Sequence, residues 1–134
     1  MKVEWIKIPG RPLSAQAKQK KQKRHYIELI ETCGRQRFPK PWSVPLSVQI
    51  FYVIDRRAGH TPDLDNLDKL VLDALKSIVY LDDGQIRSRK SERLYCGEPV
   101  VSSANIMPPA SELQKTAQLK KEECTFIGVT DVLL

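Results

Sequence analysis

The chain has 134 residues, a formal net charge of +6 and a sequence pI near 9.3. A chain of this length most simply forms one domain around one hydrophobic core, so we expect a single domain over residues 1–134. Its excess of basic residues favours a polyanionic partner over an acidic substrate. No apolar run approaches the ~18 residues of a membrane span, and no apolar stretch typical of a signal peptide follows the start.

Cysteine usage indicates the compartment. Cys33, Cys96 and Cys124 show no short metal-binding spacing, and any disulfide would leave one of them over. This usage fits a reduced, intracellular setting. We therefore expect a cytoplasmic protein that does not enter a membrane.

The N-terminal part of the chain predicts a strand and then a helix. Residues 2–8 are partly apolar on both faces, which indicates a strand, and Pro9-Gly10 ends it. Ser14 is a suitable cap for a helix that runs to about Cys33. The buried patch of this helix is expected to consist of Tyr26, Ile27, Leu29, Ile30 and Cys33.

The basic segment, residues 11–40, holds most of the chain's positive charge. It contains nine basic residues against two acidic ones, a net charge of +7, so the rest of the chain is close to neutral. Such asymmetry indicates a phosphate-binding face, although a solvated helix surface would also carry a run of lysines. His25 in this segment is a phosphate contact at most. The candidate DNA-binding residues here are Lys18, Lys20, Lys21, Lys23 and Arg24.

A second strand leads to a group of acidic residues. Residues 46–54 first alternate and then become continuously apolar, which is typical of a strand buried on both faces. Active-site loops commonly start where a core strand stops, because the scaffold fixes the root of the loop. The loop after this strand carries His60, which could approach a substrate, although loop histidines are usually idle.

An amphipathic helix follows this loop. Apolar residues recur at three- and four-residue spacing and predict a helix from about residue 64 to residue 78. Asp63 or Asp65 can cap its first free N–H groups. Asp82 and Asp83 lie beyond it in a glycine turn, from which the chain can double back. The expected buried stripe consists of Leu64, Leu67, Val71, Ala74, Leu75 and Ile78.

The return of the chain could bring Asp83 near Asp63 and Asp65. Carboxylates a few ångströms apart repel one another and raise one another's pKa values, and a divalent cation removes this conflict. Magnesium prefers oxygen ligands and is usually held by one or two carboxylates together with water and substrate phosphate. An isolated Asp-x-Asp is also typical of helix capping. Lys69 and the second acidic pair favour a metal site.

The chain beyond the acidic residues predicts further strands. Residues 85–95 alternate loosely with a basic exposed side, so Arg87 and Arg89 would continue the DNA-binding surface. Residues 100–107 predict another strand and residues 110–121 a short helix. Together the elements predict an α+β fold, in which two main helices pack on a mixed β-sheet of about four strands.

Some apolar residues are candidates for a subunit interface. Leu70 and Leu72 lie off the expected buried stripe of the amphipathic helix predicted from about residue 64 to residue 78. Residues 125–134 predict a terminal strand or a segment that packs on a partner, and closed dimers are the commonest oligomers. These side chains could equally complete the core of their own subunit. The tail residues concerned are Phe126, Ile127, Val129, Val132, Leu133 and Leu134.

Three short runs stand in a specific order, and they are Asp63-Leu64-Asp65-Asn66-Leu67-x-Lys69, then Asp73-Ala74-Leu75, then Leu81-Asp82-Asp83-x-Gln85-Ile86. They resemble the signature of the RusA-type Holliday-junction resolvases, a family of phage- and bacteria-derived endonucleases. The N-terminal region departs from that family, which often has an Asn and aromatic residues after its prolines, whereas this chain has Gln16 there.

The resemblance implies a metal-dependent endonuclease that acts as a homodimer on four-way DNA junctions, with Mg²⁺ or Mn²⁺ as its cofactor. It implies that Asp63, Asp65 and Asp83 are metal-binding catalytic carboxylates, with Asp82 a weaker metal candidate. Lys69 would be the catalytic lysine. In such a site the ion activates water and stabilises the leaving oxygen, and a lysine neutralises charge on the phosphoryl oxygens. Lys69 could instead form only an ion pair with an aspartate one helical turn away.

Two other classes of protein remain open. A non-catalytic nucleic-acid-binding module would need only the basic segment, and the acidic residues would then be helix caps. Its binding would not respond to metal or to Asp→Asn changes. A phage-encoded interaction protein could keep the fold and lose the activity, although the intact acidic residues speak against that alternative.

Overall fold

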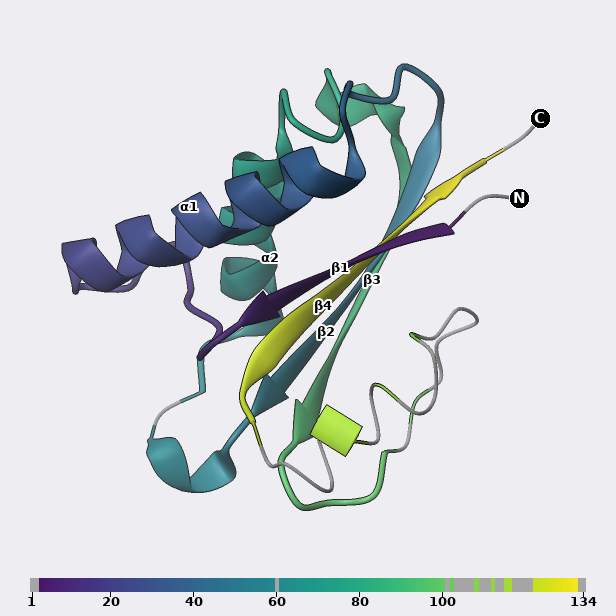
Figure 1. The fold of residues 1–134 in the computed structure, drawn as a ribbon. Coiled ribbons are helices and arrows are strands. Elements are labelled where there is room, and N and C mark those ends of the chain that lie inside the picture. Colours follow the sequence, from purple (N-terminus) through teal and green to yellow (C-terminus); the bar gives the residue numbers. More distant parts are fainter. Residues whose placement is uncertain are drawn as a thin grey trace.

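The structure is a computed structural model, and it describes residues 3–59, 61–100, 102, 108, 112, 115, 116 and 122–132. Its four described strands form one mixed sheet in the order β1-β4-β2-β3. Helices α1 and α2 cover the same face of this sheet (Figure 1). This is the α+β arrangement predicted from the sequence. In chain order the elements are β1 (Val3–Pro9), α1 (Lys20–Arg37), β2 (Leu46–Ile54), η1 (Arg56–Ala58), α2 (Leu64–Leu75), η2 (Asp83–Gln85), β3 (Ile86–Tyr95) and β4 (Cys124–Asp131).

The last strand of the chain is central in the sheet. β4 pairs antiparallel with β1 on one side and with β2 on the other, while β3 runs parallel to β2 at the far edge. Phe126, Ile127 and Val129 are therefore buried within the chain itself. The prediction that these tail residues serve a partner is wrong for them, because both edges of β4 are already paired. Leu133 and Leu134 lie outside the described residues.

The apolar run of β2 supplies two hydrophobic clusters on opposite faces of the sheet. Val48, Ile50 and Tyr52 pack beneath the helices, whereas Phe51 and Val53 pack on the other side. Burial on both faces, as predicted, accounts for the lack of alternation along this strand. The second cluster consists of Phe51, Val53, Leu94, Cys124 and Phe126, with Trp5, Cys96 and Val100 packed against it.

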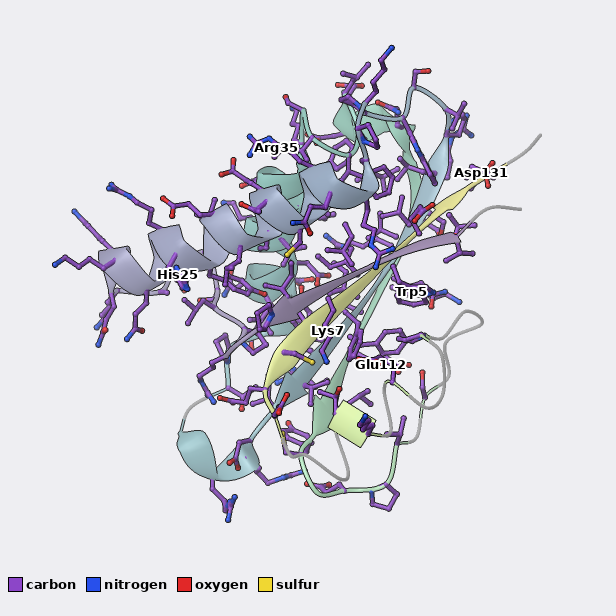
Figure 2. The ribbon with its side chains drawn as sticks, viewed as in Figure 1. Trp5, Lys7, His25, Arg35, Glu112 and Asp131 are labelled. Carbon is purple, nitrogen blue, oxygen red and sulfur yellow. The ribbon has the colours of Figure 1, made fainter. Side chains whose placement is uncertain are left out.

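The second face of the sheet is anchored through β1. Figure 2 shows Trp5 on the side of the sheet turned away from the helices, and its ring lies against Gly128, where an added Cβ would come within 2.6 Å of it. Lys7 points toward Glu112, and its Nζ lies 3.1 Å from the Glu112 carboxylate and 3.1 Å from the Thr116 hydroxyl (Figure 2). These contacts tie Glu112 and Thr116 to the edge strand.

Helix α1 starts later and ends later than predicted. It starts at Lys20, after an extended Gln19, and Ser14 is not its cap, because the Ser14 Oγ accepts a hydrogen bond from the Gln16 N–H at 3.3 Å in a local turn. The helix continues to Arg37, and Gly34 allows it to pack closely on the chain after α2, where an added Cβ would lie 3.1 Å from Ile78. Its buried residues are Tyr26, Ile30 and Gly34, while Ile27, Leu29 and Cys33 are half-buried.

Helix α2 is shorter than predicted, and it is buried on more than one side. It ends at Leu75, and Ser77 has a φ of 72°, a left-handed conformation that terminates the helix. Ile78 still packs in the core. Leu70 is only 4% exposed, so its assignment to a subunit interface is wrong, because α2 contacts both α1 and β3. Leu72 is half-buried.

The predicted strand at residues 100–107 and the predicted helix at 110–121 fall largely outside the described residues, as does His60. Among the parts of the chain that the structure describes, no helix combines the length and the apolar character needed to cross a membrane.

Candidate active site

The Asp63–Asp65 pair opens helix α2 and projects into solvent. Asp63 is the N-cap residue and Asp65 lies in the first turn. The side chain of Asp63 makes no capping hydrogen bond, so the capping role that the sequence left open for it is not used. The Asp65 side chain is 92% exposed. Two adjacent carboxylates are therefore accessible to a cation or a ligand.

Asp83 lies at the other end of the same helix. One of its carboxylate oxygens is 3.6 Å from Nζ of Lys76, the residue that directly follows α2. The 12 residues of α2 span about 18 Å at the usual rise of an α-helix. Within the described residues, no three His, Cys, Asp or Glu side chains gather into a group that could hold a metal ion. The fold of the single chain thus does not bring Asp83 beside Asp63 and Asp65. Asp82 does not join them either, since its carboxylate caps the turn by accepting the Gly84 N–H at 3.2 Å.

A hollow of about 540 Å³ lies along α2 between the two acidic ends. It places the predicted catalytic Lys69 near Arg87 and Arg89, the two predicted DNA contacts on β3. In the described structure Lys69 forms no ion pair with Asp65 or Asp73, so the ion-pair role left open for it is not realised. The residues around the hollow are Lys69, Leu72, Asp73, Tyr80, Asp83, Ile86, Arg87, Ser88 and Arg89.

Asp68 is a polar residue of the site that sequence reasoning missed. It is 1% exposed, and its carboxylate accepts hydrogen bonds from the Tyr52 hydroxyl at 2.6 Å and from the Ser91 hydroxyl at 2.8 Å. Burial raises the pKa of Asp68, and the two hydroxyl donors and Arg89 act in the opposite direction. Asp68 stands four residues after Leu64, on the expected buried stripe. An aspartate on an apolar stripe was the signal that could have revealed it.

Arg89 links the buried and the exposed carboxylates of α2. Its Nε lies 3.5 Å from Asp68, and its Nη2 lies 3.7 Å from Asp65. Arg89 comes from β3 and both aspartates come from α2, so the contact crosses from the sheet to the helix. The guanidinium is therefore placed within one site that also includes Lys69.

The basic segment lies mainly on the outer surface of α1. Lys18, Lys20, Lys21 and Arg24 are exposed, as expected for residues that contact phosphate. Lys23 is different, because it is half-buried and its Nζ donates a hydrogen bond to the Ala15 carbonyl at 2.5 Å. This bond ties α1 to the preceding loop. The N-terminal turns of α1 extend past the edge of the sheet, and His25 lies toward its N-terminal end and Arg35 toward its C-terminal end (Figures 1 and 2).

The loop before α1 forms a second wall beside Asp63. A hollow of about 420 Å³ is bordered by this loop and by Pro62, Asp63 and Asn66. The Ala15 N–H donates to the Asn66 carbonyl at 3.0 Å, which fixes the loop on the first turn of α2. Arg11 also borders this hollow.

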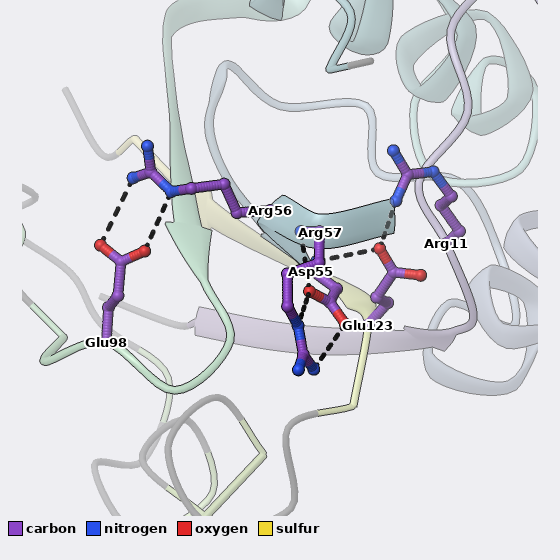
Figure 3. A network of polar contacts seen from close by, with 6 residues as sticks. All are labelled: Arg11, Asp55, Arg56, Arg57, Glu98 and Glu123. Carbon is purple, nitrogen blue, oxygen red and sulfur yellow. Dashed lines mark hydrogen bonds and ion pairs between the residues drawn. The ribbon is translucent and has the colours of Figure 1, made fainter. Parts of the chain in front are cut away.

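A polar network holds the root of the loop that leads to Asp63 (Figure 3). The Glu123 carboxylate accepts from Arg11 at 2.6 Å and from the Asp55 backbone N–H at 2.9 Å, so it joins three distant segments. Hydrogen bonds from Arg57 lower the pKa of Asp55. The loop that leads to Asp63 is thus anchored by residues from both ends of the chain.

A family model described as endodeoxyribonuclease RusA matches residues 9–102, which include all the candidate acidic residues and Lys69. No curated protein matches the chain. Because the family match covers well over half of the sequence, the chain belongs to the RusA family of endodeoxyribonucleases.

Proposed function

We propose that the protein is a metal-dependent endonuclease that binds branched DNA and resolves Holliday junctions by paired, symmetric phosphodiester cleavage in recombination and repair. Residues 1–134 would form one endonuclease domain. The observation that carries the proposal is the exposed Asp63–Asp65 pair, which makes no capping bond through Asp63 and lies on the same helix as Lys69. Membership of an endodeoxyribonuclease family agrees with this chemistry.

The Asp63–Asp65 pair fits a hard divalent cation such as Mg²⁺, with Mn²⁺ as a substitute. Magnesium is usually held by one or two carboxylates together with water and substrate phosphate, so the two accessible aspartates are ligands of the right kind. When bound, such an ion supplies an activated water and polarises the scissile phosphate. Lys69, one helical turn after Asp65, neutralises negative charge that develops on the phosphoryl oxygens. Arg87 and Arg89 hold the DNA backbone beside it.

We further propose a homodimer. Junction resolution requires two nicks at related positions, and a two-fold dimer supplies two sites with fixed geometry. The position of Asp83 gives a second reason, because α2 separates it from Asp63 and Asp65 in the same chain. In a dimer, Asp83 of one copy can complete the carboxylate pair of the other. The three free cysteines agree with the reducing cytoplasm in which we place the protein.

The proposal is tested with labelled synthetic four-way junction, fork and linear duplex, each incubated with Mg²⁺ or with EDTA. We expect cleavage of the junction in Mg²⁺ and none in EDTA. Cleavage of every substrate alike would leave a nuclease without junction preference. Binding that persists in EDTA, with no cleavage in either condition, would instead support the non-catalytic module that uses the basic segment 11–40.

A further inference from the structure

Arg89 occupies an unusual position between two carboxylates of the same helix. The Asp68 side chain is 2% exposed and the Asp65 side chain is 92% exposed, while Arg89 itself is 43% exposed. The guanidinium therefore reaches from the interior of the protein to its surface. One end of it meets a fixed, buried anion, and the other end meets a candidate metal ligand.

Asp68 is held in place by the two strands beneath α2. Tyr52 on β2 donates to Oδ1, and Ser91 on β3 donates to Oδ2. Arg89 approaches the same Oδ2 atom that Ser91 contacts. Taking a carboxylate out of water costs free energy unless hydrogen bonds and an opposite charge compensate for it. In the described part of the chain, Arg89 is the cation that lies within 4 Å of Asp68.

We propose that Asp68 is a positioning residue that holds Arg89 beside Asp65 for contact with a DNA phosphate. The inference rests on the proposed function and adds a residue outside the predicted catalytic set. An arginine has a long side chain and loses conformational entropy when it is fixed. Asp68 holds the Arg89 side chain through Nε before DNA binds, so DNA binding does not have to supply the entropy cost of ordering it. The other N–H donors of the Arg89 guanidinium remain for a phosphate that approaches Asp65.

Arginine suits this position better than lysine would. Its planar fork has five N–H donors and can contact a carboxylate and a phosphate at the same time. The ammonium of a lysine is a compact point charge without a fixed fork. A purely structural Asp68 would need a compensating charge but would not need that charge to border the hollow that contains Lys69.

The test is a double-mutant cycle with Asp68→Asn, Arg89→Gln and the double variant. Single-turnover junction cleavage in Mg²⁺ and the salt dependence of junction binding in EDTA are measured for each. Lys90→Gln is the matched control, because it removes one positive charge from the adjacent, exposed position of β3. The melting temperature of every variant is recorded, so that loss of folding is separated from loss of function.

We expect each single substitution to lower the cleavage rate constant by about tenfold, with no further loss in the double variant. Arg89→Gln should also lower the slope of log affinity against log salt by about one, and Asp68→Asn should lower it in the same direction. Lys90→Gln should leave the rate constant unchanged. Ser91→Ala is the milder variant if Asp68→Asn folds poorly. It should lower the rate constant by less than Asp68→Asn does. Added to Arg89→Gln, it should lower the rate constant no further.

Two results would overturn the inference. The first is an Asp68→Asn protein with the cleavage rate constant and salt slope of the wild type. The second is a double variant in which the two losses of cleavage rate multiply, because Asp68 would then act independently of Arg89. If the wild-type protein binds junctions but does not cut them, the proposed function fails. The salt slopes still test the positioning of Arg89 in that case.

Discussion

Asp63 and Asp83 lie at opposite ends of helix α2, although the family resemblance assigns both to one metal site. Asp63 precedes the first turn of the helix, and Asp83 pairs with Lys76 just beyond the last one. An ion that binds carboxylates at about 2.1 Å cannot reach both ends of a 12-residue helix. This separation makes the proposed dimer testable at the level of single residues.

Mixing two inactive variants should restore activity if the site is shared between subunits. Asp65→Asn and Asp83→Asn should each abolish junction cleavage alone. After subunit exchange, a mixed dimer would hold one site with both substitutions and one site with neither, so nicking should return. Single-turnover assays of each variant and of the mixture measure this. A mixture that stays inactive, although subunit exchange is demonstrated, would mean that Asp65 of one copy and Asp83 of the other do not form a shared site.

Asp65→Asn should abolish cleavage while junction binding persists or tightens. The substitution removes a candidate metal ligand and also a negative charge that faces DNA. Cleavage and binding are measured separately, the latter in EDTA. Asp131→Asn, on the end of β4 and away from α2, serves as the matched control. An Asp65→Asn protein that cuts at the wild-type rate in Mg²⁺ would remove Asp65 from the metal site.

The basic residues of α1 should separate into two groups. Lys20, Lys21 and Arg24 are exposed, so their replacement by Ala should weaken junction binding and flatten its dependence on salt. Lys23→Ala should mainly lower the melting temperature, because Lys23 is hydrogen-bonded to the Ala15 carbonyl. Fluorescence anisotropy at several salt concentrations, together with thermal unfolding, separates the two effects. An unchanged salt slope in the triple variant would mean that α1 faces away from DNA.

A dimer should cut a cruciform plasmid into linear products. Two linked sites nick both strands within one encounter, whereas a single site must release the DNA and bind it again. Sedimentation at micromolar protein concentration gives the oligomeric state, and agarose gels distinguish linear plasmid from nicked circles. A monomer that yields mainly nicked circles would remain a nuclease but would not be a resolvase.

Stability should fall in alkaline solution partly because of Cys124. Burial raises the pKa of this thiol from its ordinary value of 9.0 to about 12. A raised pKa in the folded state favours folding below the pKa of the unfolded chain, and this contribution is lost as the pH rises through the folded value. The free energy of unfolding should therefore decline between pH 9 and 12. Urea unfolding of Cys124→Ala should show a shallower decline, and the half-buried Cys33→Ala a smaller change.

Much of the fold could be predicted from local pattern alone. The continuous apolar run of β2 required burial on both faces, and the three- and four-residue spacing of leucines required an amphipathic helix. Both depend on side chains a few residues apart, which a sequence displays directly. The excess of lysine and arginine before residue 40 likewise indicated a phosphate partner, and four of its five candidate residues are exposed.

Other features depended on contacts between distant segments. The position of β4 between β1 and β2 buried the apolar C-terminal residues that the sequence suggested for a subunit interface. The packing of α2 against both α1 and β3 buried Leu70. Burial of this kind depends on elements that are far apart in the sequence, so no local pattern records it.

The sequence by itself determined the kinds of elements and the chemical groups of the candidate site, because periodicity and residue type are local properties. Only the tertiary structure decided where those groups lie. It placed Asp83 a helix length away from Asp63, and it joined Asp68 to Tyr52, Ser91 and Arg89. The physical reason is that a rigid helix fixes the distance between its two ends, while the sheet beneath it brings together residues that are far apart in the chain.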